Sequence, residues 1–257
     1  MTSHQLGTCC YKGAKHEGTA TGQLLDWQGI EAYVKHPEDG STEHAILLLT
    51  DIIGHRSINS QLIADQFAAN GYFIVMPDLF FGDSVPLNKV GELDIPKWFA
   101  GGYNAKGTNH GPSTVDPIVE LCLSTMRTEY KCQKIGAAGY CFGAKYVLRH
   151  LRSDGKAIDV GHAAHPSHVE RDDLQDITGP FSIAAAETDP VFPPENRHET
   201  EDILKSIGVP YQINLYGGVT HGFAVRGDLK DRVQLYAKEN AFLQAVQWFD
   251  EHLKNQK

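Results

Sequence analysis

The stretch Lys134-Ile-Gly-Ala-Ala-Gly-Tyr-Cys-Phe-Gly-Ala144 decides the fold. Its first half is a short apolar run, typical of a strand that is buried on both faces. The run ends in Gly139-x-Cys141-x-Gly143 and leads into an expected helix over 142–151. A sharp strand-to-helix turn with glycines on both sides holds its middle residue above the sheet in a strained conformation. The sequence therefore predicts an α/β protein in which Cys141 is a nucleophile at a helix N-terminus.

The chemistry of a helix N-terminus suits this role. Its backbone N–H groups and its positive end favour a thiolate and a developing oxyanion. The alternative is an inert buried cysteine, which is common for this residue type. With 25 glycines and five cysteines in 257 residues, a cysteine flanked in this way arises by chance in about 5% of such chains. The strand before Cys141 and the helix after it favour the nucleophile.

Outward from this turn, the apolar pattern predicts strands that alternate with helices. Strands are expected near 24–27, 30–34, 45–50, 73–76, 134–138, 158–164, 180–186 and 211–216, and helices near 60–70, 114–129, 142–151, 195–207 and 231–253. The first two strands form a hairpin. The alternation favours a mostly parallel sheet that is covered by helices on both faces.

The chain shows no internal repeat and no low-complexity linker, so we expect a single domain over 1–257. Residues 1–22 are polar and glycine-rich, and they are expected to form an irregular N-terminal arm. The stretch 77–112 is rich in glycine, proline and aromatic residues. It is too long for a plain connection and is interpreted as a lid or a substrate-facing excursion.

The composition excludes several classes of partner. The net charge is −9 and no block of lysine and arginine occurs, which disfavours nucleic acid and anionic membranes as partners. No apolar run reaches the roughly 20 residues of a membrane span, and the N-terminus lacks the apolar run of a secretory signal. The five cysteines are odd in number and irregular in spacing, which favours reduced thiols in the cytoplasm.

A cysteine nucleophile requires a base and a group that orients the base. In this architecture they follow in the order nucleophile, acid, base, on loops after later strands. Asp189 follows the strand over 180–186, and His221 follows the strand over 211–216. Alone, Asp189 would be interpreted as a turn or capping residue, and His221 as one surface histidine among 13. Their order after the nucleophile favours a triad.

Four short motifs resemble the dienelactone hydrolase family, the cysteine branch of the α/β-hydrolase fold that includes the carboxymethylenebutenolidases. They are Gly-Tyr-Cys-Phe-Gly at 139–143, Glu-Thr-Asp-Pro at 187–190, Thr-His-Gly-Phe at 220–223 and Asp-Ile-Ile-Gly at 51–54. The resemblance extends from about residue 24 to 250. The arm with Cys9 and Cys10 is similar to that of the longer, fungal-type members.

The resemblance implies hydrolysis of a small ester or lactone through an acyl-cysteine intermediate. Cys141 would attack the carbonyl carbon, and His221 would accept a proton and later return it. Asp189 would hold the imidazole in the required tautomer. The backbone N–H groups of Phe142 and Ile52 would form the oxyanion hole.

Two positions depart from the family pattern. Family members often carry a glutamate that contacts the resting thiol where this chain has Asp51, which is one methylene shorter and is alternatively a plain turn residue. The arginine that bacterial members place four residues after the catalytic histidine is Val225 here, with Arg226 one step later. The natural substrate therefore need not be dienelactone. Candidate pocket residues are Arg56, Trp98, Tyr140, His165, Phe223 and Arg226.

Other patterns are set aside. His162, His165 and His168 recur every third residue but cross a strand end and Pro166, so they share no regular face and predict no metal site. Cys9-Cys10 is interpreted as structural or incidental. No phosphate-binding loop and no dinucleotide fingerprint occurs, so no cofactor is implied.

Three alternative functions remain open at this level. One is a thioesterase-like accessory hydrolase of secondary metabolism. Another is a non-catalytic ligand-binding protein that keeps the fold without turnover. The third is a redox-sensing protein in which peroxide modifies Cys141 reversibly. The sequence does not determine the oligomeric state.

Overall fold

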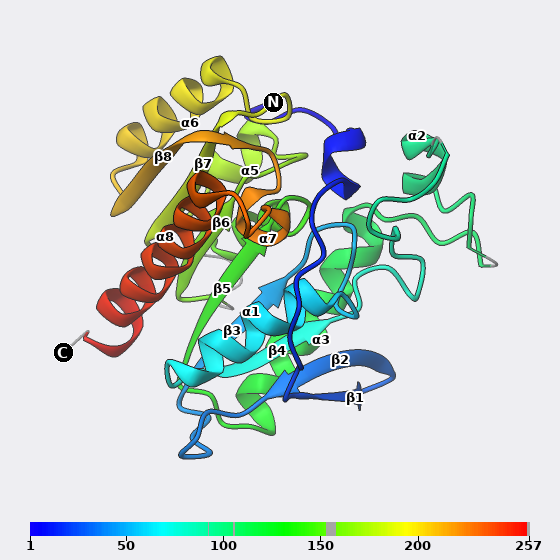
Figure 1. Ribbon diagram of the computed structural model, residues 1–257. Helices are drawn as coiled ribbons and strands as arrows, with labels where there is room; N and C mark the ends of the chain where they lie inside the picture. Colours follow the sequence, from blue (N-terminus) through cyan, green and yellow to red (C-terminus); the bar gives the residue numbers. More distant parts are fainter. Residues whose placement is uncertain (92, 105, 153–157, 256–257) are drawn as a thin grey trace.

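The computed structural model describes residues 1–91, 93–104, 106–152 and 158–255. Its strands are β1 (Gln23–Trp27), β2 (Ile30–Lys35), β3 (His44–Leu49), β4 (Phe73–Pro77), β5 (Lys134–Tyr140), β6 (Val160–Ala164), β7 (Phe181–Thr188) and β8 (Tyr211–Thr220). They form one sheet in the order β1-β2-β4-β3-β5-β6-β7-β8 (Figure 1). The β1–β2 hairpin joins β4 antiparallel, and the other neighbours pair in parallel. The predicted α/β fold with a mostly parallel sheet is confirmed.

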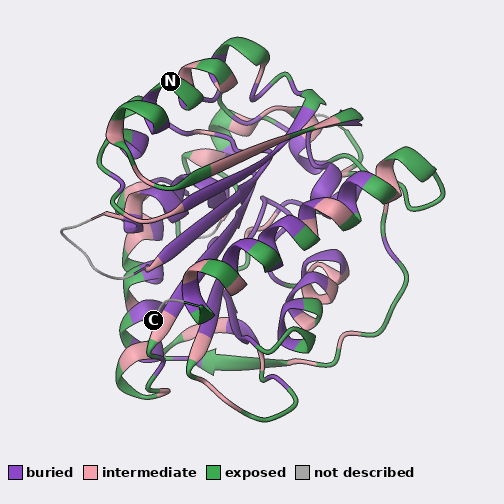
Figure 2. Ribbon diagram, turned by 90° about the vertical axis from the view of Figure 1, so that its left-hand side faces the viewer, coloured by how far each residue is buried: buried purple, intermediate pink, exposed green. Residues whose placement is uncertain are grey.

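The middle strands are buried along almost their whole length (Figure 2). Successive side chains of a strand point to opposite faces of the sheet. In β3, Leu47 therefore belongs to the apolar cluster on one face, while Ile46 and Leu48 belong to the cluster on the other. The continuous apolar runs in the sequence reflect this burial on two sides.

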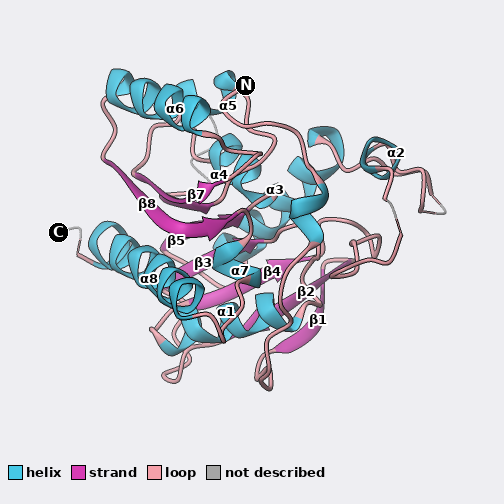
Figure 3. Ribbon diagram, turned by 45° about the horizontal axis from the view of Figure 1, so that its top comes forward, coloured by secondary structure: helices cyan, strands magenta, loops and turns pink. Residues whose placement is uncertain are grey.

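Helices cover both faces of the sheet (Figure 3). They are α1 (Ile58–Ala69), α2 (Ile95–Phe99), α3 (Pro112–Thr128), α4 (Gly143–His150), α5 (Arg171–Gln175), α6 (Pro194–Ile207), α7 (Phe223–Arg226) and α8 (Arg232–Phe249), with a short 3-10 turn η1 (Thr8–Tyr11) and a π turn η2 (Asp250–Lys254). Side chains of α3, α4, α5 and α6 pack on one face, and those of α1, α7 and α8 pack on the other. No helix in the described parts of the chain has the length and apolar character that a membrane crossing requires.

The turn between β5 and α4 has the sharp geometry that its glycines predict. Cys141 has a φ of 52°, a left-handed conformation that is rare for residues other than glycine. The glycines on either side permit close backbone contacts. A Cβ on Gly139 would lie 2.7 Å from Cα of Ala144, and one on Gly143 would overlap the carbonyl group of Leu49 at the end of β3. Strain of this kind is typical of functional sites.

We predict that Gly143→Ala lowers the free energy of unfolding by about 3 kcal/mol or more, because a Cβ would push β3 and α4 apart. Urea denaturation of the purified variant measures this change. Gly217→Ala is the matched control, since a Cβ at Gly217 meets nothing within 4 Å. Equal stabilities of the two variants would show that the close approach of β3 and α4 does not constrain Gly143.

Two segments differ from the expected pattern. β8 continues past Tyr216 to Thr220, so Gly217 and Gly218 lie in the strand and not in a loop. Its pairing with β7 is irregular between Ala186 and Thr188, and it resumes at Thr188 opposite Thr220. The final helix ends at Phe249 and continues as a π turn.

The stretch 77–112 is mostly irregular. Among its described residues, α2 is the one helix that lies wholly within it. Residues 92 and 105 lie outside the described residues.

The N-terminal arm is bound to the body of the protein over most of its length. In Figure 1 it runs from the top of the molecule past α7 to β1. Near its start, Ser3 exchanges hydrogen bonds with Val169. Further along, the carbonyl group of Tyr11 accepts from the amide of Asn88 at 2.8 Å. Because the arm has hydrogen-bond partners at several points along its length, its backbone is fixed against the rest of the protein.

Candidate active site

The carboxyl ends of β5, β7 and β8 bring three side chains together. Nε2 of His221 lies 3.2 Å from Sγ of Cys141. Nδ1 of the same ring lies 2.9 Å from Oδ2 and 3.0 Å from Oδ1 of Asp189. All three residues are buried. The three residues therefore have the connectivity of a nucleophile, a base and an orienting acid.

The sheet fixes the acid and the base. The pairing of Thr188 with Thr220 makes Asp189 and His221 the next residues on neighbouring strands. The backbone amides of Val191 and Phe192 donate to Oδ1 of Asp189 at 2.8 and 3.0 Å. Oδ2 has no other hydrogen-bond partner among the described residues and is the nearer oxygen to the imidazole ring, at 2.9 Å. These two backbone contacts therefore hold the carboxylate in position independently of its contact with the histidine.

The charges of this group support an ion pair between Cys141 and His221. Burial raises the pKa of the Cys141 thiol, but the Cys10 thiol and the His221 charge outweigh burial and hold that pKa well below its usual range. Burial lowers the pKa of His221, while the charges of Cys141 and Asp189 raise it to about 10. Near neutral pH the arrangement therefore favours a thiolate beside an imidazolium.

The two backbone amides predicted for an oxyanion hole lie on adjacent turns. The end of β3 pairs with the end of β5, Leu49 opposite Gly139. The amide of Gly143 donates to the carbonyl of Thr50 at 3.1 Å, which joins the two turns. Among the described residues, the amides of Ile52 and Phe142 have no acceptor. Both residues are buried, so these two amides are free to donate hydrogen bonds to a developing oxyanion.

Asp51 and Arg226 form a buried ion pair beside the nucleophile. Nη1 of Arg226 donates to Oδ2 of Asp51, whose Oδ1 accepts from the amide of Ile53 at 3.0 Å. Burial raises the pKa of the Asp51 carboxyl, and the Arg226 guanidinium opposes that rise. Arg226 also donates to the carbonyl groups of Lys12 and Cys9 at 3.2 Å each. The arginine therefore holds the arm in place over the site.

The remaining pocket candidates lie in different surroundings. The side chain of Arg56 is 64% exposed and pairs with Glu31 on β2. Trp98 is buried and packs against Phe80 and Phe142, and its Nε1 donates to the carbonyl of Asp83. The structure thus ties Arg56 to the rim of the sheet, whereas Trp98 joins the stretch 77–112 to the residue after the nucleophile.

His165 lies directly against the triad. Its ring centroid is 5.0 Å from that of His221, and it also contacts Phe223 and Tyr140. Burial lowers the pKa of His165 to about 4, so the ring is neutral near pH 7. The other two histidines of the predicted series lie elsewhere: His162 packs on Phe249, and His168 stacks on Phe99.

Sequence reasoning missed two residues at this site. Sγ of Cys10 lies 3.6 Å from Nε2 of His221, the same atom that faces Cys141. Oγ of Ser167 lies 3.4 Å from Sγ of Cys141, and its amide donates to the Cys141 carbonyl. The adjacent cysteines at 9 and 10 were the one feature of the sequence that could have pointed to a role for Cys10. No sequence pattern distinguished Ser167.

Donor atoms for a soft metal also gather here. Sγ of Cys9, Sγ of Cys10 and a ring nitrogen of His221 lie within 4.8 Å of one another, as do Sγ of Cys141 and ring nitrogens of His165 and His221. Thiolate and imidazole ligands suit zinc. The sequence analysis predicted no metal site, because it considered the histidines at 162, 165 and 168, which share no regular face, and not these groups from separate segments.

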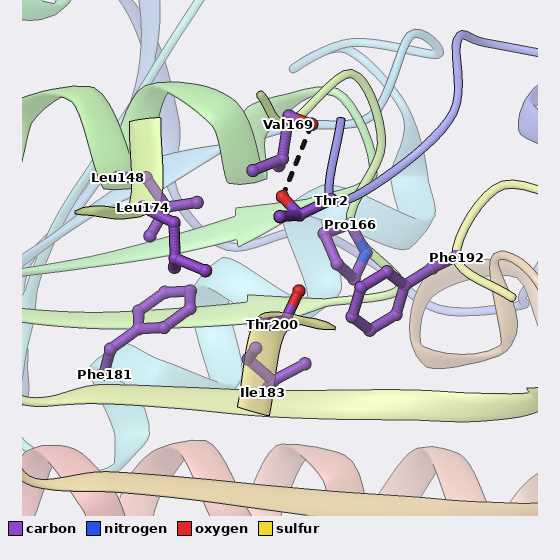
Figure 4. Close-up of a pocket in the computed structure, with 9 residues that line it drawn as sticks. All are labelled: Thr2, Leu148, Pro166, Val169, Leu174, Phe181, Ile183, Phe192 and Thr200. Atoms are coloured by element: carbon purple, nitrogen blue, oxygen red, sulfur yellow. Dashed lines mark hydrogen bonds between the residues drawn. The ribbon is translucent and has the colours of Figure 1, made fainter. Parts of the chain in front are cut away.

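A cavity of about 610 Å³ lies between the arm and the segment around α2. It is lined by Leu6–Thr8 on one side and by Leu93–Pro96 and Tyr103 on the other. A volume of several hundred Å³ matches that of small-molecule sites. A second cavity lies beneath Thr2, between apolar side chains (Figure 4). Its volume of about 10 Å³ is no more than one water molecule requires.

Comparison with known proteins places these features in a family. The family model described as "Dienelactone hydrolase family" matches residues 30–253. The chain is 57% identical to "Hydrolase tropI" of Talaromyces stipitatus over 99% of each chain. It is 48% identical to "Hydrolase pyvD" of Aspergillus violaceofuscus over 99% of this chain and 100% of that protein. A putative dienelactone hydrolase from Klebsiella pneumoniae has the same fold, with a TM-score of 0.70 and 15% identity over 90% of this chain and 98% of that one.

Proposed function

Because this chain belongs to the dienelactone hydrolase family and is a hydrolase, we propose that it cleaves a small ester or lactone through an acyl-cysteine intermediate. The observation that carries the proposal is the buried arrangement of Cys141, His221 and Asp189. An ester hydrolase requires a nucleophile, a proton carrier and an oxyanion site, and each has a counterpart at this edge of the sheet.

In the acylation half, Sγ of Cys141 attacks the substrate carbonyl carbon, and the amides of Phe142 and Ile52 donate hydrogen bonds to the developing oxyanion. Nε2–H of His221 protonates the leaving alkoxide as the carbon–oxygen bond breaks. In the deacylation half, the neutral His221 takes a proton from water, and the resulting hydroxide attacks the thioester. The acid product leaves, and Cys141 regains its negative charge beside the imidazolium.

Access to the nucleophile requires movement. Cys141 is 0% exposed, and Cys10 and Tyr11 of the arm are buried with it. We propose that the substrate reaches the triad from the cavity of about 610 Å³ when η1 moves away from His221. The stretch 77–112 would then line the substrate, since Trp98 packs against Phe142. A lid formed by the arm and this stretch would exclude water during acylation.

Two further proposals concern partners and location. The partner is a small-molecule ester or lactone, and we propose no nucleic acid or membrane partner because the net charge is −9. A cytoplasmic location is supported by the cysteines, since all five are free thiols.

The test is a panel that contains dienelactone and short aryl and alkyl esters. We expect turnover of at least one member, because the triad is assembled in the folded chain. Rapid mixing with an aryl ester, followed by acid quenching, should give a mass increase of one acyl group on the peptide that contains Cys141. Turnover without any trapped adduct on that peptide, under conditions in which deacylation is slow, would contradict the acyl-cysteine step.

A further inference from the structure

The loop after β6 places a second imidazole beside the nucleophile. In the sheet, β6 lies between β5, which precedes Cys141, and β7, which precedes Asp189. Ala164, the last residue of β6, pairs with Tyr140, the last residue of β5. His165 and Cys141 are therefore the next residues on two neighbouring strands. Four consecutive strands, β5 to β8, thus each lead into one residue of the same cluster.

The backbone holds both residues in an unusual conformation. φ is 52° at Cys141 and 39° at His165, in the left-handed region that residues other than glycine rarely adopt. The amide of Cys141 donates to the carbonyl of Ala164 at 3.1 Å. The amide of His165 donates to the carbonyl of Ala184 on β7 at 2.9 Å. Strain of this kind persists where the surrounding structure imposes it, and it is typical of functional sites.

The ring of His165 faces the catalytic pair. It is 0% exposed, and its centroid lies 5.0 Å from that of His221. One of its nitrogens is within 4.8 Å of Sγ of Cys141 and of a ring nitrogen of His221. Burial opposes a low pKa at Cys141, while the side chains of Cys10 and His165 both lower it. Apart from this interaction with Cys141, the ring nitrogens of His165 have no hydrogen-bond partner among the described residues.

The charge state of His165 makes it a donor and not a second base. Burial, together with the charges of His221 and Arg226, lowers the pKa of His165 to about 4. Near pH 7 the ring is therefore neutral, with one N–H group and one unprotonated nitrogen. A hydrogen bond that is donated to the charged form of a group lowers the pKa of that group. The N–H of His165 is thus suited to a thiolate at Cys141.

Other groups also act on the charge of Cys141. Those that titrate or carry charge are Cys9, Cys10, Asp51, His168, His221 and Arg226. Cys10 is the strongest of the side chains that lower the pKa of Cys141. It belongs to η1, so it leaves when the arm opens. His165 belongs to the sheet and stays beside Cys141 when the substrate enters.

We propose that the ring N–H of His165 donates to Sγ of Cys141 and keeps the nucleophile a thiolate while the arm is open. The proposal rests on the proposed function, because the nucleophile that His165 serves is the one assigned there. In acylation, the N–H of His165 maintains the reactive form of the thiol before attack. In deacylation, it stabilises the thiolate as the bond between sulfur and the acyl carbon breaks.

The test measures the thiolate directly and requires no turnover, so its outcome is separate from that of the ester panel. Ultraviolet absorbance is followed against pH, and the curve of the same protein with Cys141→Ala is subtracted. All proteins carry Cys10→Ala, which removes the donor of the arm. Loss of a donor to the thiolate raises the pKa of Cys141. His165→Phe should therefore lower the ratio of thiolate to thiol at a fixed acidic pH by about tenfold or more.

Two further variants separate donation from packing. His165→Gln restores an N–H donor and should keep the ratio within about threefold of the parent. His162→Phe is the matched control, because His162 is equally buried on β6 but packs on Phe249. It should leave the thiolate curve unchanged. In kcat/KM, His165→Phe should move the acid limb of the pH profile to higher pH, with rates that converge with those of the parent above it.

A second measurement covers the case in which His165→Phe does not fold. In the NMR spectrum of the wild type, the ring N–H proton of His165 should shift when Cys141→Ala removes the thiolate at constant pH.

Three results would overturn the proposal. One is a thiolate curve of His165→Phe that coincides with that of the parent. Another is a loss in His165→Gln as large as that in His165→Phe, which would assign the ring a packing role. The third is a ring N–H resonance of His165 that does not respond to Cys141→Ala.

Discussion

Cys141→Ala is expected to lower kcat/KM by about 10³-fold or more for every ester that the wild type cleaves. The side chain is the one thiol of the described residues at the turn between β5 and α4, where the amide of Phe142, like that of Ile52, has no acceptor among those residues. Alanine removes the attacking atom and also the negative charge that stabilises the imidazolium of His221. Initial rates over a range of substrate concentrations measure the loss.

Any residual activity of Cys141→Ala could come from the second thiol beside His221, that of Cys10. Cys10 lies 3.6 Å from His221 and could act as a substitute nucleophile. The double variant Cys10→Ala/Cys141→Ala distinguishes turnover by Cys10 from background hydrolysis. Cys132→Ser is the control for loss of a thiol elsewhere and should retain full kcat/KM. A decrease of less than about tenfold in Cys141→Ala would refute the nucleophile assignment.

Asp189→Asn is expected to lower kcat by about 10²–10⁴-fold with little change in stability. Oδ1 of Asp189 accepts from the amides of Val191 and Phe192, so the carbonyl oxygen of asparagine should stay there. Its NH₂ group then faces Nδ1 of His221 in place of Oδ2. A donor at that position requires an unprotonated Nδ1, and it places the ring proton on Nε2 in the wrong tautomer.

The control for this substitution is Glu187→Gln, which removes a charge two residues earlier. The Glu187 carboxylate is exposed and accepts from the amide of Gly218, so it does not contact the imidazole. Its kcat should stay within about threefold of the wild type, since exposed substitutions are close to neutral. If Asp189→Asn also retained nearly full kcat, the carboxylate would have a structural role only, and His221 would be oriented by other contacts.

The local features of the sequence predicted most of the fold. Glycines at 139 and 143 are required where β5 turns into α4, and a Cβ at Gly143 would overlap the end of β3. The apolar runs identified the buried strands because a strand between two helical layers has apolar residues on both faces. The order of Cys141, Asp189 and His221 along the chain was also informative. Each residue follows a parallel strand, and these strands end at one edge of the sheet.

The sequence by itself thus determined the class of fold and predicted that Cys141, Asp189 and His221 would meet, because each depends on a short pattern beside a strand end. Only the tertiary structure decided what surrounds them. Arg226 pairs with Asp51, which lies 175 residues away, and Cys10 reaches His221 across 211 residues. Contacts of this kind leave no periodicity and no spacing in the chain, because they depend on how the arm folds back over the completed sheet. The closed arm, which places Cys10 beside His221, follows from that packing alone.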